Sequence, residues 1–170
     1  MIRLEHSVAP SRRSAALYAL LACLLLLLGG CAGDVAEISP EDRQAIRTLL
    51  ESYLPLMAES YGSGRFEKLE DFAVEKEIAS VRKRVNDLAL GGRDLRPELV
   101  SVEVEDITVW NHSNAFVTTL EIWNLHIYAT GTETVLSEEL GQRNRVKYQI
   151  KRREEGWQVL YRTLDTTFDG

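Results

Sequence analysis

The chain has 170 residues, of which 45% are hydrophobic and 27% charged, and its formal net charge is −6 at neutral pH. This length and apolar content suit one folded domain with a hydrophobic core of its own. The acidic balance argues against a nucleic-acid-binding protein, which would concentrate Lys and Arg on one face.

The start of the chain has the three parts of a secretory signal: a basic beginning, an apolar middle and small residues at a cleavage site. Arg3, Arg12 and Arg13 precede the uncharged run 15–28. That run is shorter than the roughly 20 apolar residues of a membrane-spanning helix. The Arg pair also leaves twin-arginine export as an alternative, although the residues around it match that signal poorly.

Residues 28–31 read Leu-Gly-Gly-Cys and resemble the lipobox of bacterial lipoproteins. The resemblance implies a signal peptide over residues 1–30 and acyl chains on Cys31, which would hold the protein on the lipid bilayer. Because Ala32 rather than Asp follows the Cys, the family rule implies the outer membrane, facing the periplasm, in a Gram-negative cell. A Gram-positive cell surface and an ordinary signal peptide remain the alternatives.

The part of the chain after Cys31 is expected to fold without disulfides, because the other Cys, Cys23, belongs to the leader. Residues 31–38 are predicted to be the acylated Cys and a short linker, and residues 39–170 a single domain. Residues 32–170 carry 17 Lys and Arg against 25 Asp and Glu. This excess of acid argues against an electrostatic hold on anionic lipid.

A capped helix is predicted from Ser39. Ser39 can accept a hydrogen bond from the first turn, and Pro40 suits the first helical position. We expect Pro55 to bend this helix, because proline cannot donate a backbone hydrogen bond, and the run 62–64 to end it. The apolar residues recur at helical spacing, and they are Ile46, Leu49, Leu50, Tyr53, Met57 and Tyr61.

Two further helical segments are predicted before the chain changes character. A short helix is expected over residues 66–73. Apolar residues at spacings of four and three over residues 74–88 then predict a longer helix, which ends at Gly91. This stripe could be a coiled-coil seam, but it covers about two heptads, so a helix laid on a sheet is favoured.

From Leu99 onward the apolar period is two, which predicts strands. A change of phase near Glu105 and Asp106 predicts a bulge, and residues 130–141 are expected to form a polar connection. The fold class is therefore α+β, with N-terminal helices on a curled four-stranded antiparallel sheet. The expected strands are residues 99–110, 115–129, 143–152 and 157–167.

Three features together resemble a known superfamily. They are a first helix ending in Tyr-Gly-Ser-Gly-Arg at 61–65, a strand after Pro97, and a last hairpin with Val-x-Tyr-x-Ile at 146–150 and Gly-Trp-x-Val at 156–159. This order is similar to the nuclear-transport-factor-2-like fold of ketosteroid isomerase and SnoaL-type proteins. It is most similar to the IMS-type domain of plastid-division proteins. The resemblance implies a cone, but its members include isomerases, hydrolases and binding modules, so it implies no single function.

An isomerase of this fold would need a carboxylate base in a pocket and a Tyr as oxyanion donor. Asp94 is expected to be solvated. Glu121 shares an apolar strand face with Trp123, so it is either a functional carboxylate or the partner of a Lys or Arg on a neighbouring strand. Further aromatic residues, Trp110, Trp157 and Tyr161, could line a cavity or fill the core. The predicted pocket-lining residues are Tyr53, Met57, Tyr61, Trp123 and Tyr148.

Metal and cofactor sites are not predicted. His112 is expected in a solvated turn, and His126 lacks a nearby Ser or Cys nucleophile. Two distant His residues without Cys make a poor metal set, and no phosphate loop or nucleophile elbow is present. We therefore predict no cofactor and no catalytic residues. A basic stripe over residues 143–153 could dock an acidic partner, or it could face Glu103, Glu105 and Glu121 across the sheet.

Two functions remain open at this point. The favoured hypothesis is a membrane-anchored, non-enzymatic protein-binding or assembly module, whose partner is an envelope protein or a second copy. The alternative is a domain that binds or isomerises a small apolar ligand, which predicts a cavity above about 300 Å³ with a polar group at its base. A purely structural spacer is disfavoured by the short linker.

Overall fold

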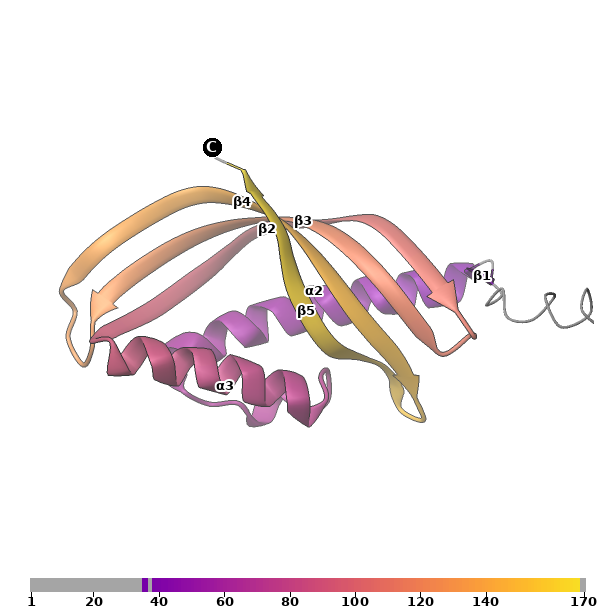
Figure 1. Ribbon diagram of the computed structural model, residues 1–170, viewed down its shortest axis with the longest axis horizontal. Coiled ribbons are helices and arrows are strands. Elements are labelled where there is room, and N and C mark those ends of the chain that lie inside the picture. The colour runs from indigo at the N-terminus through magenta and orange to yellow at the C-terminus, as the bar shows by residue number, and fades with distance from the viewer. Residues whose placement is uncertain (1–34, 37, 169–170) are drawn as a thin grey trace, which may run out of the picture. The chain divides into compact units, whose positions relative to one another are not determined.

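The computed structural model describes residues 35–36 and 38–168 (Figure 1). The predicted signal peptide and Cys31 lie outside the described residues. The elements in chain order are β1 (Val35–Ala36), α2 (Pro40–Ser63), the 3-10 turn η1 (Glu67–Leu69), α3 (Glu75–Leu90), β2 (Arg93–Trp110), β3 (Asn114–Ala129), β4 (Val135–Arg153) and β5 (Gly156–Phe168).

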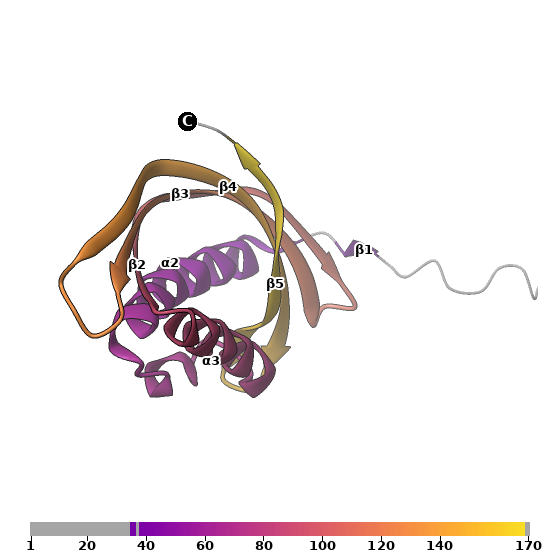
Figure 2. The same cartoon turned by 60° about the vertical axis from the view of Figure 1, so that its left-hand side comes forward.

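The strands form one antiparallel sheet in the order β1-β2-β3-β4-β5. The four long strands curl around α2 and α3, which lie on the concave side (Figure 2). We call this arrangement the cone. The expected α+β fold, with helices packed on a curled four-stranded antiparallel sheet, is therefore confirmed. The two-residue β1 is an addition that lies on the free edge of β2.

Helix α2 begins where its capping residue predicts. The Ser39 hydroxyl accepts a hydrogen bond from the Asp42 backbone N–H at 3.0 Å, and Pro40 occupies the first turn. The helix continues without interruption past Pro55. It ends at Gly64, whose φ of 68° is the left-handed conformation that glycine adopts without a steric penalty.

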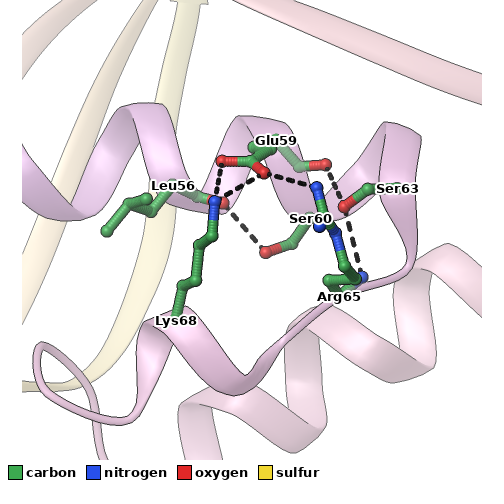
Figure 3. A network of polar contacts seen from close by, with 6 residues as sticks. All are labelled: Leu56, Glu59, Ser60, Ser63, Arg65 and Lys68. Carbon is green, nitrogen blue, oxygen red and sulfur yellow. Dashed lines mark hydrogen bonds and ion pairs between the residues drawn. The ribbon is translucent and has the colours of Figure 1, made fainter.

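Polar contacts tie the end of α2 to η1 (Figure 3). The Glu59 carboxylate accepts hydrogen bonds from Arg65 at 3.1 Å and from Lys68 at 2.9 Å. The Ser63 hydroxyl donates to the Glu59 carbonyl at 2.9 Å. Exposed ion pairs of this kind contribute little to stability, so their main effect is to orient the turn that leads toward α3.

The strands are longer than the sequence pattern predicts. β2 begins at Arg93 instead of Leu99, and β4 begins at Val135, inside the segment expected to be a polar connection. Residues 135–140 are exposed throughout, so their sequence lacks the alternation that marks a half-buried strand. The predicted bulge is confirmed, because the pairing of β2 with β3 shifts between Val104 and Asp106.

The segment between the helices also differs from the prediction of a short helix over residues 66–73. Only η1 is helical there. The chain then turns into an extended conformation, and Ala73 forms a parallel bridge with Val159 of β5. The Val74 N–H donates to the Val159 carbonyl at 3.0 Å. Backbone pairing with β5 therefore replaces the last turns of the expected helix.

The hydrophobic core extends along the cone, and the half nearest the start of α2 is filled with apolar side chains. We call this half the closed half. Its side chains come from the first part of α2 and from the inner face of the sheet. The fully buried members include Ile46, Leu50, Leu54, Val117, Ile150 and Val159.

Candidate functional site

The other half of the cone contains a cavity of about 320 Å³. It lies between the last turns of α2, the middle of α3 and the inner face of the sheet. We call this half the open half. Its apolar lining comes from all four long strands and both helices: Met57, Val81, Leu95, Pro97, Trp123, Leu125, Val146 and Leu164. Its polar lining is Tyr61, Ser80, Arg84, Glu121, Gln142, Asn144, Arg162 and Thr167.

A buried carboxylate forms part of the cavity floor. Glu121 is 1% exposed. Its Oε1 accepts hydrogen bonds from the Tyr148 hydroxyl at 2.6 Å and the Thr119 hydroxyl at 2.8 Å, and its Oε2 accepts from the Trp123 indole N–H at 2.8 Å. Three donors replace the water that the carboxylate loses on burial, which is what a buried charge requires.

Strand alternation places these groups together. Thr119, Glu121 and Trp123 are alternate residues of β3, so they point to the same, inner face. In the antiparallel register, Glu121 lies directly opposite Asn144 of β4. Tyr148 lies on the inner face of β4 as well and is fully buried. The polar floor therefore forms because these polar residues occupy inward-facing positions of the paired strands β3 and β4.

A buried ion pair lies beside this floor. Arg162 of β5 donates through Nε to Glu77 Oε1 of α3 at 3.2 Å, and the side chains are 19% and 3% exposed. The Tyr53 hydroxyl donates to the same Glu77 oxygen at 2.8 Å. Arg162 Nη2 also donates to the Tyr61 hydroxyl at 3.4 Å. These contacts connect α2, α3 and β5 around one carboxylate.

The two central tyrosines are held in their neutral, donating form. Burial, together with the neighbouring Glu121 charge, raises the pKa of Tyr148 well above its ordinary value of 10.0. Burial also raises the pKa of Tyr53 well above 10.0, and Glu77 adds to the effect, although Arg162 opposes it. Both hydroxyls therefore stay protonated as hydrogen-bond donors at neutral pH.

Two polar side chains that line the cavity have hydrogen-bonding atoms without a partner among the described residues. The buried Oδ1 of Asn144 has no hydrogen-bond partner among the described residues, while its Nδ2 donates to Gln142 at 3.2 Å. Arg162 has five N–H donors, and its contacts within the described part of the chain use Nε and Nη2. Arg162 therefore offers the cavity N–H donors that a bound molecule could accept from, whereas the enclosed Asn144 Oδ1 is not accessible from it.

The structure brings the sequence-predicted pocket residues together, but at two depths. Met57, Tyr61 and Trp123 line the cavity. Tyr53 and Tyr148 lie behind its wall, fully buried, where they hold Glu77 and Glu121.

Other expectations for single residues are corrected or refined. Glu121 is hydrogen-bonded to Tyr, Trp and Thr, so the interpretation that it pairs with a Lys or Arg is wrong. Asp94 accepts a hydrogen bond from the Gly131 N–H at 3.2 Å, and His126 Nδ1 lies 3.0 Å from Glu138. Neither residue lines the cavity.

Two members of the basic stripe on β4 pair with acidic residues on the outer face of the sheet. Arg145 contacts Glu105 at 2.7 Å, and Lys147 contacts Asp165 at 2.8 Å. Within the described ranges, no group of three or more His, Cys, Asp and Glu side chains is placed to hold a metal ion. None of the helices there has the length and apolar character that crossing a bilayer requires.

Glu77, Asn144 and Arg162 were not predicted from the sequence. The pairing of β4 with β5 shifts between Gln149 and Ile150, so Arg162 lies opposite the inward-facing Tyr148. Tyr161, which the regular alternation would turn inward, is instead 41% exposed. A bulge of this kind leaves no signal in the residue pattern. Glu77 did carry one, because it shares a face with the apolar Val81 four residues later.

Comparison with known proteins agrees with this architecture. No protein-family model matches the chain, and no curated protein matches it. Among solved structures, the chain is similar to the intermembrane space region of the chloroplast protein ARC6, with 14% identity and a TM-score of 0.62. That match covers 76% of this chain and 98% of the other.

Two further matches have lower scores. One is an NTF2-like protein with a cystatin-like fold from Novosphingobium aromaticivorans, with 18% identity, a TM-score of 0.43, and coverage of 87% of this chain and 88% of the other. The other is a domain of unknown function with a cystatin-like fold from Nostoc punctiforme, with 17% identity, a TM-score of 0.42, and coverage of 75% and 78%. The resemblance to the IMS-type domain that was expected from the sequence is confirmed at the level of fold, because the chain shares the fold of the ARC6 intermembrane space region.

Proposed function

We propose that this domain binds a small amphipathic molecule in the cavity of the open half. The observation that carries the proposal is the cavity itself, since about 320 Å³ falls within the range of small-molecule sites. Such sites combine apolar walls with convergent polar groups, and this cavity is lined by eight apolar and eight polar residues. The proposal favours the ligand-binding alternative over the assembly module.

The polar floor suggests the chemistry of the ligand. Arg162 lines the cavity, and its remaining N–H groups can donate to an acceptor on a ligand. A hydroxyl or carbonyl oxygen supplies such an acceptor. Because Arg162 is already paired with Glu77, a neutral polar group suits the site. The apolar body of the ligand would contact Trp123 and Leu125.

The contacts of Glu121 support a binding role more than a catalytic one. All three of its partners belong to the protein, and they fix the positions of Trp123 and Tyr148. Its carboxylate thereby holds the cavity wall in one geometry, as a preorganised binding site requires.

We further propose that Cys31 is acylated and holds this domain on a bilayer surface, with the outer membrane of a Gram-negative cell, facing the periplasm, as the expected location. The Leu-Gly-Gly-Cys resemblance supports this step. Mass spectrometry of the mature protein should show a chain that begins at Cys31 and carries acyl groups. A mature chain without acyl groups, which washes freely out of cells, would overturn the anchor and leave the ligand proposal standing.

Binding can be tested with prodan, a neutral naphthyl ketone dye whose rings suit the apolar wall and whose carbonyl oxygen can accept from Arg162. We expect the mature protein to enhance the fluorescence of the dye with a saturable, single-site curve. Ser80→Trp should abolish this signal, because Ser80 is exposed on α3 and lines the cavity. Ala79→Trp is the matched control, since Ala79 is exposed on α3 but does not line the cavity.

Equal dye binding by Ser80→Trp and the unaltered protein would overturn the proposal, because the dye would then bind elsewhere. Absence of saturable binding by the unaltered protein would overturn it as well. Far-ultraviolet circular dichroism of both variants checks that each is folded, so that loss of binding reports a blocked cavity.

A second candidate function, protein binding, is favoured by the free edge of β4. β5 pairs with β4 only as far as Arg143, opposite Phe168, so residues 135–140 have no strand on that side within the described ranges. Leu136 and Leu140 are 54% and 67% exposed there. Long apolar edges are normally protected, and another chain can pair with such an edge.

This candidate predicts self-association or a complex with an envelope protein. Light scattering of the mature protein over a range of concentrations measures the first, and pull-down from the envelope measures the second. Leu140→Lys should abolish either association. Leu90→Lys is the control, because Leu90 is 88% exposed at the end of α3. A monomer that captures no partner would count against protein binding.

A further inference from the structure

An aromatic pair, half-buried Trp110 and exposed Phe116, lies on the outer face of the sheet, at the turn between β2 and β3. The rings of Trp110 and Phe116 stack with their centroids 4.7 Å apart. Val109 and Val117 point into the core, so the alternating Trp110 and Phe116 point outward. Phe116 is 45% exposed. No function described so far uses this pair.

The described chain begins next to this pair. Val35 of β1 lies opposite Trp110 in the antiparallel register. Neighbouring strands are about 5 Å apart, so the backbone at Val35 lies beside the backbone at Trp110. Ile38, three residues later, packs against the hydrophobic core. The start of the domain is thus fixed at this end of the sheet.

The tether to the predicted anchor is short. Residues 32–34 separate Cys31 from Val35, so a fully extended chain places Cys31 at most about 14 Å from Val35. With the strand spacing added, Trp110 lies within about 20 Å of Cys31. An acylated Cys31 would lie in the headgroup region, which is roughly 5–8 Å thick on each side of the hydrocarbon core.

We propose that the Trp110–Phe116 pair rests in the headgroup region of the bilayer and fixes the orientation of the domain. The proposal rests on the acylation of Cys31, which is itself proposed above. Trp is enriched at membrane interfaces, because its ring suits the apolar side and its N–H suits water. The pair supplies a second contact with the bilayer besides the acylated Cys31.

We expect the aromatic side chains to drive binding to the bilayer, because the basic and acidic residues around the Trp110–Phe116 pair balance each other. Lys151 lies opposite Asn114 in the register, and Arg153 ends β4. Glu154 and Glu155 follow directly in the turn. Basic and acidic groups offset each other here, so we expect contact with the bilayer to depend little on anionic lipid.

The test uses the acylated full-length product in phosphatidylcholine vesicles that contain brominated acyl chains, which quench nearby tryptophans. Trp123 and Trp157 are only 4% and 6% exposed, so Trp110 should provide nearly all of the quenched fluorescence. We expect clear quenching in the unaltered protein and almost none in Trp110→Phe. Addition of phosphatidylglycerol should leave the quenching unchanged.

Phe116→Ser should reduce the quenching of Trp110, whereas Leu140→Ser, at an exposed site of the same sheet, should not. Quenching that is absent in the acylated protein, or that persists in Trp110→Phe, would overturn the inference. A mass spectrum without acyl groups would instead overturn the anchor, so the two failures are distinguishable.

Discussion

The two halves of the cone share the same helix and the same strands, yet apolar side chains fill the interior of the closed half, whereas the interior of the open half contains a cavity. In the closed half, Ile46 and Leu50 of α2 meet Val117, Ile150 and Val159 of the sheet, all fully buried. In the open half, the same face of the sheet carries a carboxylate, an amide and a guanidinium group. The comparison separates the residues that hold the fold from those that shape the site.

The change occurs along one strand. The inward residues of β3 run from Ala115 and Val117 to Thr119, Glu121 and Trp123. Apolar side chains interdigitate and leave no space. The polar side chains instead satisfy one another across the cavity floor, and this requires fixed geometry. The open half therefore depends on a hydrogen-bonded network where the closed half depends on packing.

The largest expected effect is the loss of the buried cation. Arg162→Met leaves the Glu77 carboxylate, 3% exposed, without its opposite charge. Removal of one partner of a buried pair typically costs about 3–5 kcal/mol. Urea unfolding should show a loss of that order. Arg145→Met is the control, because the Arg145–Glu105 pair lies on the outer face, and it should leave the midpoint almost unchanged. Equal effects would contradict the assignment of Arg162 to a buried network.

A cavity made in the closed half should cost nearly as much. Leu50 is fully buried, so Leu50→Ala should lower the free energy of unfolding by about 2–5 kcal/mol. Leu164 lines the cavity and is 58% exposed, so Leu164→Ala should change it by no more than about 0.5 kcal/mol. Thermal or urea unfolding measures both. A large loss from Leu164→Ala would mean that the open half is packed like the closed half.

A smaller effect is expected from one hydrogen bond of the floor. Tyr148→Phe removes the 2.6 Å donor to Glu121 and keeps the ring, so stability should fall by about 1–3 kcal/mol. Tyr161→Phe is the control, because Tyr161 is 41% exposed. If both variants unfold at the same urea concentration, Tyr148 does not stabilise the carboxylate.

The smallest expected effect is the one that follows from the raised pKa values of two tyrosines. It should leave the free energy of unfolding unchanged at neutral pH and lower it only at alkaline pH. Tyr53 and Tyr148 have a pKa above 10.0 when folded and close to 10 when unfolded. Above the unfolded pKa the folded state retains more protons, so stability is complete below pH 10 and falls as the pH rises further. Unfolding followed across alkaline pH should show this decline, and Tyr148→Phe should make it shallower. A decline that begins well below pH 10 would contradict this origin.

Much of the fold could be predicted because its signals are local. Ser39 and Pro40 mark the start of α2, and the alternation of Val146, Tyr148 and Ile150 marks an inner face that the structure confirms. The missed strand segment, residues 135–140, is exposed on both faces, so no burial pattern exists to predict it. The β-strand propensity of single residues predicts a strand poorly where neither of its faces is buried.

The candidate site was predicted less completely, because it depends on contacts distant in sequence. Glu77 and Arg162 are 85 residues apart, and only the curl of the sheet brings them together. Aromatic residues on inward positions could be recognised, so Trp123 and Tyr148 were identified. The bulge that turns Arg162 inward depends on strand pairing, which residue patterns do not specify.

The 24 residues of α2 set the distance between the two ends of the molecule. The helix starts close to β1 and reaches the cavity at Met57, about 26 Å farther along its axis. An attachment at the β1 end of the domain would therefore leave the cavity at the far end of α2 from the point of attachment.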